Sequence, residues 1–376
     1  MASQAAGIIF SSLNNNTLSR LTSERTVAAI PFACRYRLVD FSLSNMVNAN
    51  ISNIFIVANY KYRSLLEHLG SGKDWDLARR EGGITLVSPF LTAAGYENKM
   101  FSTHMEALKS MKEYIDEIKE EYVVLMDSDV ALTIDVSDII RSHDQSGCDV
   151  TIVTSDVEPD YTAKHNRIMI SSVAGKVTQI AMGFSYDERH PELALGIYVM
   201  KTLYLRKIIE EAEAYNLDSF TMLLLKNCKS SNYRTYKYTG FAASVSSFLD
   251  YYKYSIELAT NEKARESLLG KKETPIYTRV HNSAPTMHTS SAKVENSLIA
   301  DECVIEGTVI NSVIFRDVKI EKGAVVKNCV LFHGSHVGKN ANLNCIVADK
   351  DVYVSDDVTL SGNDNLPFYI QKGRKI

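Results

Sequence analysis

The sequence predicts two domains of different architecture, an α/β domain with a mostly parallel sheet followed by a parallel β-helix. Three observations favour this organisation. The chain of 376 residues is long enough for two domains. Short β-branched runs alternate with amphipathic segments up to about Tyr252. From Val294 onward, short apolar runs recur in coils of 15 to 17 residues. We place the first domain at 1–255, a linker at 256–290 and the β-helix at 291–376.

The elements of the first domain follow from hydrophobic periodicity. A buried strand ends at "AGII", and the predicted strand 53–59 is followed by a helix at 63–69. The segment 103–118 has apolar residues at helical spacing, 121–129 is a strand that ends in carboxylates, and 148–156 is a further strand. The active site of such a sheet lies beyond the carboxyl ends of its strands, at a topological switch point.

The second domain is predicted from its coil length. After the proline-containing segment 271–286, coils start at Ser297, Ser312, Cys329 and Cys345. Short strands separated by Glu-Lys-Gly and Gly-Lys-Asn corners at this spacing are typical of hexapeptide β-helices. A β-sandwich is the alternative, but it does not require so regular a coil length. Stacking of neighbouring coils also accounts for Cys329 and Cys345 better than chemistry does.

Composition excludes several classes of protein. The net charge of -4 and the pI near 6.2 argue against a nucleic-acid binder that works by bulk electrostatics. The longest apolar runs are too short to span a bilayer, and the N-terminus lacks a signal pattern. Six cysteines without metal-ligand spacing favour reduced thiols. We therefore expect a cytoplasmic protein without nucleic-acid or membrane partners.

The loop after the first strand has an unusual composition for its position. A polar loop between the first strand and first helix is where α/β proteins usually hold phosphate. No glycine occurs between Phe10 and Asn45, and Arg20 and Arg25 are the only cations before Arg35. The loop therefore lacks the residue types that grip a phosphate group.

Three segments carry a family resemblance. "PFACRYRLVDFSLSN", which starts at Pro31, resembles the P-F-G-G-R-Y-R-L-I-D-F-x-L-S-N block of the glucose-1-phosphate adenylyltransferases. "GIYVMKTLYL" (196–205) and "YKYTGFAASVSSFLDYY" (236–252) are similar to that family's G-I-Y-V-F and G-Y-W-x-D-V-G-T segments. The resemblance covers nearly the whole chain. It implies a Rossmann-like, GT-A-like nucleotidyltransferase domain, a C-terminal left-handed parallel β-helix, and Mg²⁺ in the family reaction.

This chain departs from the family pattern at the positions that bind substrate. Ser12 and Asn14 belong to a stretch that replaces the Gly-Gly-Arg-Gly loop, and side chains there obstruct the approach of a triphosphate to the backbone. Val27 stands where the family has the phosphate-binding lysine, and Ser244 stands where it has a metal-binding aspartate. The Glu-Lys-Pro motif for the sugar phosphate is absent, and the G-T-A-D purine segment is replaced near 103–106.

One catalytic element remains as a remnant. Asp127 and Asp129 end a predicted strand, and Asp129 aligns with the aspartate that holds Mg²⁺ in the family's G-D-H motif. Residues i and i+2 of a strand point the same way, so both carboxylates can face one ion. The alternative is that strand-end aspartates are solvated or cap the next turn.

These departures resemble the GlgD-type subunit, a catalytically poor partner of the active GlgC-type subunit. The resemblance implies a regulatory, catalytically deficient chain with no functional catalytic residue and no required cofactor. Its partner is the GlgC-type subunit, in a hetero-oligomer that we expect to be a tetramer. The complex makes ADP-glucose from ATP and glucose 1-phosphate for bacterial glycogen.

A regulatory site is predicted between the domains. In the family, the arginine at the position of Arg37 lies near the domain interface, where phosphorylated sugar effectors bind. We predict that Arg35, Arg37 and Lys339 form an anion site. The alternative is that these are ordinary solvated charges.

Three other functions remain open on the sequence alone. An active nucleotidyltransferase with a rebuilt loop would use Arg20 or Arg25 as the phosphate cation, with Asp127 and Asp129 sharing Mg²⁺. A glycosyltransferase would use the same carboxylates as a D-x-D motif. An acyltransferase would need a histidine base in the β-helix, and His333 and His336 are the candidates.

Overall fold

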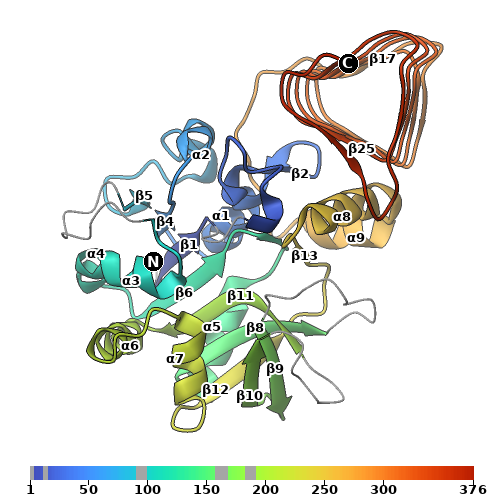
Figure 1. Cartoon of the computed structure of the whole chain (residues 1–376). Helices are drawn as coiled ribbons and strands as arrows, with labels where there is room; N and C mark the ends of the chain where they lie inside the picture. Colours follow the sequence, from blue (N-terminus) through green and yellow to red (C-terminus); the bar gives the residue numbers. More distant parts are fainter. Residues whose placement is uncertain (1–3, 12–15, 90–99, 157–167, 183–191) are drawn as a thin grey trace.

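A nine-stranded sheet forms the centre of the first domain in the computed structural model, which describes residues 4–11, 16–89, 100–156, 168–182 and 192–376 (Figure 1). The strand order is β5-β4-β1-β6-β11-β8-β12-β10-β9. The strands are β1 (Ala5–Phe10), β4 (Asn53–Val57), β5 (Gly83–Val87), β6 (Tyr122–Asp127), β8 (Val150–Asp156), β9 (Ile168–Val173), β10 (Lys176–Met182), β11 (Glu192–Lys201) and β12 (Tyr233–Lys237).

Strand direction divides this sheet into two halves. The strands β5, β4, β1 and β6 are mutually parallel, as the alternation of strands and helices predicts. The other half is mixed, because β11 runs antiparallel to both β6 and β8, and β10 runs antiparallel to β12 and β9. The chain builds β1, β4 and β5 in one direction and then returns to place β6 on the other side of β1. This reversal is a topological switch point.

Helices cover both faces of the sheet (Figure 1). Within β1, Ala5 and Ile9 face one core, and Ala6, Ile8 and Phe10 face the other, as the two-residue period of a strand requires. The predicted helix 103–118 is broken at Met111 into α3 and α4. The helices are α1 (Leu38–Asn48), α2 (Arg63–Leu69), α3 (His104–Ser110), α4 (Lys112–Glu117), α5 (Val136–Ser146), α6 (Thr202–Ala214), α7 (Phe220–Asn227), α8 (Phe248–Thr260) and α9 (Glu262–Leu269).

Several short elements complete the first domain. They are the 3₁₀ helices η1 (Asn16–Leu18), η2 (Val27–Ala29) and η3 (Lys73–Trp75), the pair β2 (Pro31–Phe32) and β3 (Tyr36–Arg37), and the pair β7 (Val130–Ala131) and β13 (Ala243–Ser244). None of the helices in the described ranges combines the length and the apolar character needed to cross a membrane.

The C-terminal domain is a parallel β-helix with three sheets of five short strands. The inward-facing residues of the middle sheet stack in register from Val294 through Val309, Val326 and Leu343 to Leu360. The strands are β14 (Met287–His288), β17 (Val304–Ile305), β20 (Lys319–Ile320), β23 (His336–Val337) and β26 (Tyr353–Val354); β15 (Lys293–Glu295), β18 (Thr308–Ile310), β21 (Val325–Lys327), β24 (Asn342–Asn344) and β27 (Thr359–Ser361); and β16 (Leu298–Ile299), β19 (Val313–Ile314), β22 (Val330–Leu331), β25 (Ile346–Ala348) and β28 (Phe368–Ile370).

An asparagine ladder runs along one corner of the β-helix. The side-chain amide of Asn311 donates to Asn328 at 3.2 Å, and Asn328 donates to Asn344 at 3.1 Å. Both Asn311 and Asn328 have positive φ, a conformation that asparagine tolerates better than most residues. Cys329 and Cys345 follow this corner in neighbouring coils, and both are buried and free. Stacking therefore explains these two cysteines, as expected.

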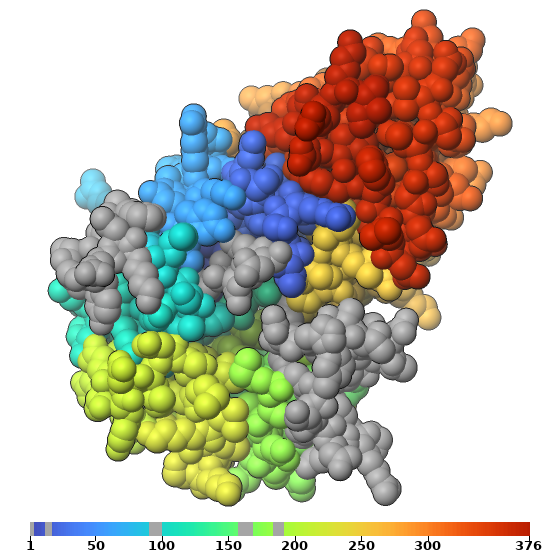
Figure 2. All heavy atoms as spheres, in the orientation of Figure 1, coloured from blue at the N-terminus to red at the C-terminus, as the bar shows by residue number. Residues whose placement is uncertain are grey.

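Helix α8 and residues 18–41 pack directly against the β-helix (Figures 1 and 2). Tyr251 and Tyr252 of α8 lie in the same apolar cluster as Phe315 and Phe332 of the β-helix, and the Tyr252 hydroxyl donates to the Asn328 carbonyl at 3.0 Å. The end of α8 and all of α9 fall within the predicted linker 256–290, so this segment is partly helical. The two domains therefore share one apolar interface.

Candidate functional site

A cavity lies at the carboxyl ends of β1 and β6, at the switch point of the sheet. Phe10 ends β1, and its partner in the parallel register is Asp127 at the end of β6. The volume of the cavity is about 350 Å³. The lining residues come from the strands β1, β6, β9, β10 and β11, from η1, and from the starts of α3, α7 and α8. They are Phe10, Thr17, Leu18, Ser102, Thr103, His104, Leu125, Asp127, Asp129, Ile168, Met182, Ala194, Gly196, Tyr198, Ser219, Phe220, Thr221, Val245 and Ser246.

The two predicted carboxylates both line this cavity. Asp127 and Asp129 lie on the same side of the strand end, as their spacing predicts. The carbonyl of Asp129 accepts from the Val245 N–H at 2.8 Å, which joins the strand end to the segment that contains Ser244. The structure therefore brings the G-D-H and D-V-G-T positions of the family together.

His104 is a member of this site that sequence reasoning missed. Its Nε2 lies 2.6 Å from Asp127 Oδ1, and its ring meets the Phe10 ring edge-on at 4.5 Å between centroids. Burial lowers the pKa of His104, but the charge of Asp127 and the hydrogen bond to it outweigh burial and raise the pKa above its usual value. His104 and Asp127 therefore form a hydrogen-bonded pair at the end of the strand.

Gly196 allows the Asp127 side chain to occupy its position. Its φ is +70°, and a Cβ at this residue would lie 2.5 Å from Asp127 Oδ2. Only glycine fits both the backbone conformation and the close approach. The glycine of the "GIYVM" segment is thus explained by contact with a carboxylate of the cleft.

The carboxylates do not make a complete metal site. Among the described residues, no group of three or more His, Cys, Asp or Glu side chains is arranged to hold a metal ion. Asp127 Oδ1 is already bonded to His104, and Ser244 replaces the second family aspartate. Mg²⁺ in phosphate-transfer sites is usually held by one or two carboxylates together with substrate phosphates and water. Asp127, which is paired with His104, and Asp129 are the described carboxylates of this site, and with Ser244 in place of the second family aspartate they are a weaker ligand set than the family pattern provides.

The degenerate positions have structural roles where the structure describes them. Val27 lies in η2 and is fully buried among apolar side chains of the domain interface. Ser244 is buried in β13 opposite Val130, and its hydroxyl has no hydrogen-bond partner in the described part of the chain. Ser12 and Asn14 lie outside the described residues.

The described lining of the cavity contains no lysine or arginine. Arg25, a candidate to replace the phosphate lysine, instead forms a buried pair with Asp349 of the β-helix. Arg20, the other candidate, lies over the Phe248 ring at 5.2 Å and lines a separate surface groove. Neither arginine faces the cavity.

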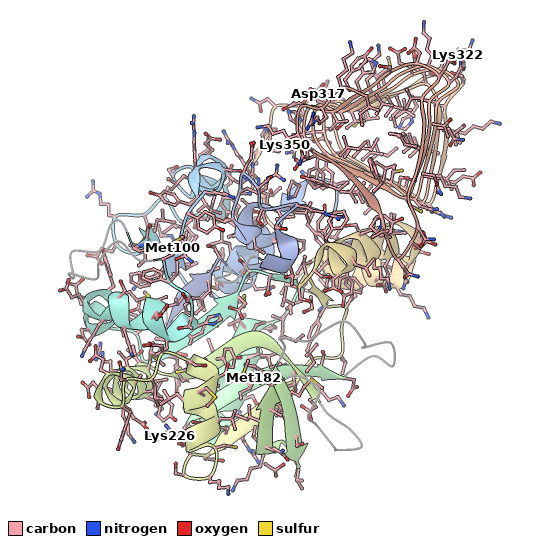
Figure 3. All side chains as sticks on the ribbon, in the orientation of Figure 1. Met100, Met182, Lys226, Asp317, Lys322 and Lys350 are labelled. Atoms are coloured by element: carbon pink, nitrogen blue, oxygen red, sulfur yellow. The ribbon has the colours of Figure 1, made fainter. Side chains whose placement is uncertain are left out.

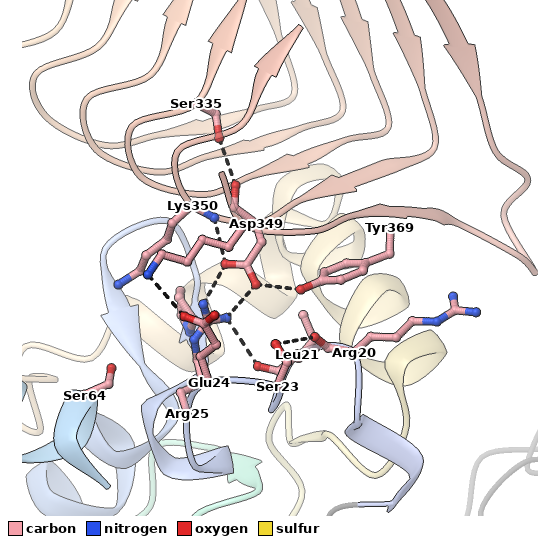
Figure 4. A network of polar contacts seen from close by, with 12 residues as sticks. Arg20, Leu21, Ser23, Glu24, Arg25, Ser64, Ser335, Asp349, Lys350 and Tyr369 are labelled. Carbon is pink, nitrogen blue, oxygen red and sulfur yellow. Dashed lines mark hydrogen bonds and ion pairs between the residues drawn. The ribbon is translucent and has the colours of Figure 1, made fainter. Parts of the chain in front are cut away.

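The pair of Arg25 and Asp349 joins the two domains (Figure 4). The guanidinium donates to both carboxylate oxygens, at 3.0 and 2.7 Å. The Tyr369 hydroxyl donates to Asp349 Oδ2 at 2.6 Å, and the Lys350 N–H donates to Oδ1 at 2.7 Å. Bidentate geometry and full satisfaction of the carboxylate make this pair a fixed connection. Sequence reasoning missed it, because the partners lie 324 residues apart.

The predicted anion residues are only partly brought together. Arg37 lies at the domain interface, where its guanidinium donates to the carbonyl and hydroxyl of Ser64 at 2.6 and 2.9 Å. Arg35 is exposed, with its guanidinium 5.7 Å from the Tyr36 ring centroid. Lys339 is exposed near Glu321, whose pKa is lowered first by its hydrogen bond to Lys319 and to a smaller extent by the charge of Lys339. The structure does not bring Lys339 to Arg37.

Lys350, rather than Lys339, is the β-helix lysine whose charge interacts with that of Arg37. It lies where the β-helix faces the first domain (Figures 3 and 4). Burial, followed by the charges of Arg37 and Arg25, lowers the pKa of Lys350 to about 8. Burial also lowers the pKa of Arg37 to about 10, with Arg25 and Arg279 adding to the effect against Asp40. Several cations therefore crowd this part of the interface.

The remainder of the "RYRLVDF" block is structural. Asp40 Oδ2 accepts the Arg37 N–H at 3.0 Å at the start of α1, and Asp40 Oδ1 lies 2.6 Å from Nε2 of the buried His68.

The two histidines that an acyltransferase would need, His333 and His336, make their contacts within the β-helix itself. His336 Nε2 lies 3.1 Å from Glu321, and His333 Nδ1 lies 3.2 Å from the Arg316 carbonyl.

Comparisons with known proteins agree with this organisation. Residues 7–238 match the nucleotidyl transferase family, and residues 282–366 match the GlmU-like C-terminal hexapeptide family. The chain is 32% identical to the glycogen biosynthesis protein GlgD of Bacillus subtilis over 374 residues, which is 98% of this chain and 96% of that one. It is 33% identical to GlgD of Geobacillus stearothermophilus over 327 residues, covering 87% and 84%. It is 27% identical to the glucose-1-phosphate adenylyltransferase of Bacillus cereus over 356 residues, covering 93% and 92%.

Proposed function

This chain belongs to the nucleotidyl transferase family, among the GlgD-type glycogen biosynthesis proteins related to the glucose-1-phosphate adenylyltransferases, and from that premise we propose that it is a catalytically deficient, regulatory subunit. The observation that carries the proposal is the absence of lysine and arginine from the described lining of the cleft. Nucleotidyl transfer depends on positioning and on neutralising phosphate charge.

The magnitude of the loss supports deficiency. Removing one preorganised charge-stabilising group typically costs about 10²–10³ in rate. This chain has Val27 buried in place of one phosphate cation and Ser244 in place of one metal ligand, and Arg25 is held by Asp349. These losses in rate need not multiply. Even part of the combined loss would reduce turnover to a low level.

The chain acts, on this proposal, through a catalytic GlgC-type subunit in a hetero-oligomer, which we take to be a tetramer. It modulates the synthesis of ADP-glucose from ATP and glucose 1-phosphate for glycogen and requires no cofactor of its own. The location of the complex is the cytoplasm.

Co-purification with the GlgC-type subunit tests this proposal. The two chains are expressed separately and together, and ADP-glucose and pyrophosphate formation are measured for each species. We expect no turnover by this chain alone, a stable complex of the two, and altered kinetics of the complex relative to the catalytic subunit alone. Robust turnover by the pure chain would show that it is not catalytically deficient. Failure of the two chains to associate would show that the GlgC-type subunit is not its partner.

The cations between the domains support an effector site in which Lys350 takes the place predicted for Lys339. Arg37 and Lys350 bring like charges together in a partly buried place, next to Arg25, whose charge is paired with Asp349. An anion relieves this repulsion and gains charge-assisted hydrogen bonds. A phosphorylated sugar is the expected ligand.

Titration calorimetry with a sugar phosphate tests the effector site. Lys350→Met should weaken binding at least about tenfold, because a hydrogen bond to a charged group contributes about 1.5–3 kcal/mol. Arg37→Ala should weaken it as well. Lys339→Met is the matched control, since it removes the same charge from an exposed place beside Glu321. Equal affinity of wild type and Lys350→Met would end the idea.

A further inference from the structure

The cavity at the ends of β1 and β6 remains open despite the changed residues around it. Its volume of about 350 Å³ is in the range of small-molecule sites. Met182 at its edge is half exposed, and Phe220 and Tyr198 line it with their rings 5.2 Å apart and nearly perpendicular (Figure 3). Loss of phosphate-binding residues has therefore not filled the site with side chains.

The described lining is unsuited to phosphate in two further ways. Helix starts attract phosphate through their unsatisfied N–H groups. Three helix starts lie at the cavity, and each is capped by a side chain. Thr103 Oγ1 accepts the Glu106 N–H of α3 at 3.1 Å, Ser219 Oγ accepts the Met222 N–H of α7 at 3.2 Å, and Ser247 Oγ accepts the Asp250 N–H of α8 at 3.1 Å. Asp129 adds a carboxylate that disfavours an anion, and Asp127 adds a second one that is hydrogen-bonded to His104.

The same lining suits a ligand that carries hydroxyl groups and no charge. Carboxylate and hydroxyl oxygens accept hydrogen bonds from sugar hydroxyls, and Asp127, Asp129 and Thr221 supply such oxygens. Phe10, Tyr198 and Phe220 supply aromatic surface. A pocket that is mostly apolar with a few convergent polar groups is the usual form of a small-molecule site.

We propose that this cavity binds an uncharged polyhydroxylated ligand, either a free hexose or a nucleoside without phosphate. The inference rests on the proposed function in one respect, namely that the cleft no longer binds phosphate groups. It assigns to the degenerate cleft a binding role that needs no metal and no turnover.

The test compares matched pairs of ligands by titration calorimetry on the full chain. The pairs are glucose with glucose 1-phosphate, and adenosine with ATP, all without divalent cation. We expect the uncharged member of one pair to bind at least about tenfold more tightly than its phosphorylated form, and the pair concerned distinguishes a hexose site from a nucleoside site.

Two charge variants locate the binding within the cavity. Thr221→Lys places a cation in the lining and should reverse the preference toward the phosphorylated member. Met222→Lys is the matched control, because it adds the same charge at the next position of α7, where the side chain is exposed and does not line the cavity. Ser102→Lys, at another lining position that is exposed, serves if Thr221→Lys does not fold.

The outcomes separate this inference from the proposed function. If neither glucose nor adenosine binds, or if the phosphorylated forms bind more tightly without reacting, the inference is overturned and the deficiency stands. If the phosphorylated forms bind and are turned over once Mg²⁺ is added, the proposed function is overturned too. An unchanged preference in both lysine variants at the cavity would place the ligand elsewhere and also overturn the inference.

Discussion

Replacing Asp349 by asparagine removes the charge that holds Arg25 at the domain interface. The side chains of this pair are 4% and 1% exposed, and the carboxylate also accepts a hydrogen bond from the Tyr369 hydroxyl. Asparagine keeps the shape of the carboxylate but has one acceptor oxygen instead of two. Arg25 is then a buried cation without a counterion.

The expected loss in free energy of unfolding is about 3 kcal/mol. Breaking a buried ion pair by removing one partner costs about 3–5 kcal/mol, because the remaining charge stays desolvated. The remaining amide oxygen still accepts one bond from Arg25, so we take the lower end of this range. Replacing both partners together, as Arg25→Met with Asp349→Leu, should cost less than the single change, because no buried charge remains.

Urea unfolding measures these differences with two signals. Far-ultraviolet circular dichroism follows both domains, and fluorescence of Trp75, the single tryptophan, follows the first domain. The double variant is the control for the change of shape. A loss in free energy of unfolding below about 1 kcal/mol for Asp349→Asn would refute the view that this ion pair is desolvated and fully hydrogen-bonded. A double variant less stable than the single one would refute it as well.

Three further predictions concern the cleft and the interface. Gly196→Ala should lower the free energy of unfolding by about 1–3 kcal/mol, since the positive φ and the contact with Asp127 both oppose a Cβ; denaturant titration showing less than about 0.5 kcal/mol would contradict this. Val27→Lys should destabilise by about 3 kcal/mol or more without restoring turnover, because the position is fully buried, with Val27→Met as control in thermal unfolding and activity assays. The affinity of the site at Arg37 and Lys350 for sulfate should fall as pH rises through about 8, the pKa of Lys350, because an anion favours the protonated amine. Calorimetry with Lys350→Arg should show no such pH dependence. A Lys350→Arg variant with the same pH profile as the wild type would contradict this prediction.

Local patterns explain why much of the fold could be predicted. The coils of the β-helix follow from a repeat length, and the strands of the first domain follow from short β-branched runs. The half of the sheet around β11 is mixed rather than parallel, because strand direction depends on how distant segments pair. The predicted helix 103–118 breaks at Met111, a change that its apolar spacing does not signal.

The site was predictable where it depends on residue type at a known position. Val27 in place of a cation, and Asp127 and Asp129 at a strand end, could be identified before any coordinates. The contact of His104 with Asp127 and the choice of Lys350 over Lys339 could not, because each joins segments that the chain order does not relate.

By itself the sequence determined which chemical groups this protein possesses and which it lacks, since covalent identity does not depend on folding. Tertiary structure alone decided that Arg25 meets Asp349 rather than a phosphate, and that the His104 imidazole meets Asp127 in the cleft. The physical reason is that charge interactions depend on distance and burial, which arise only when remote segments pack together.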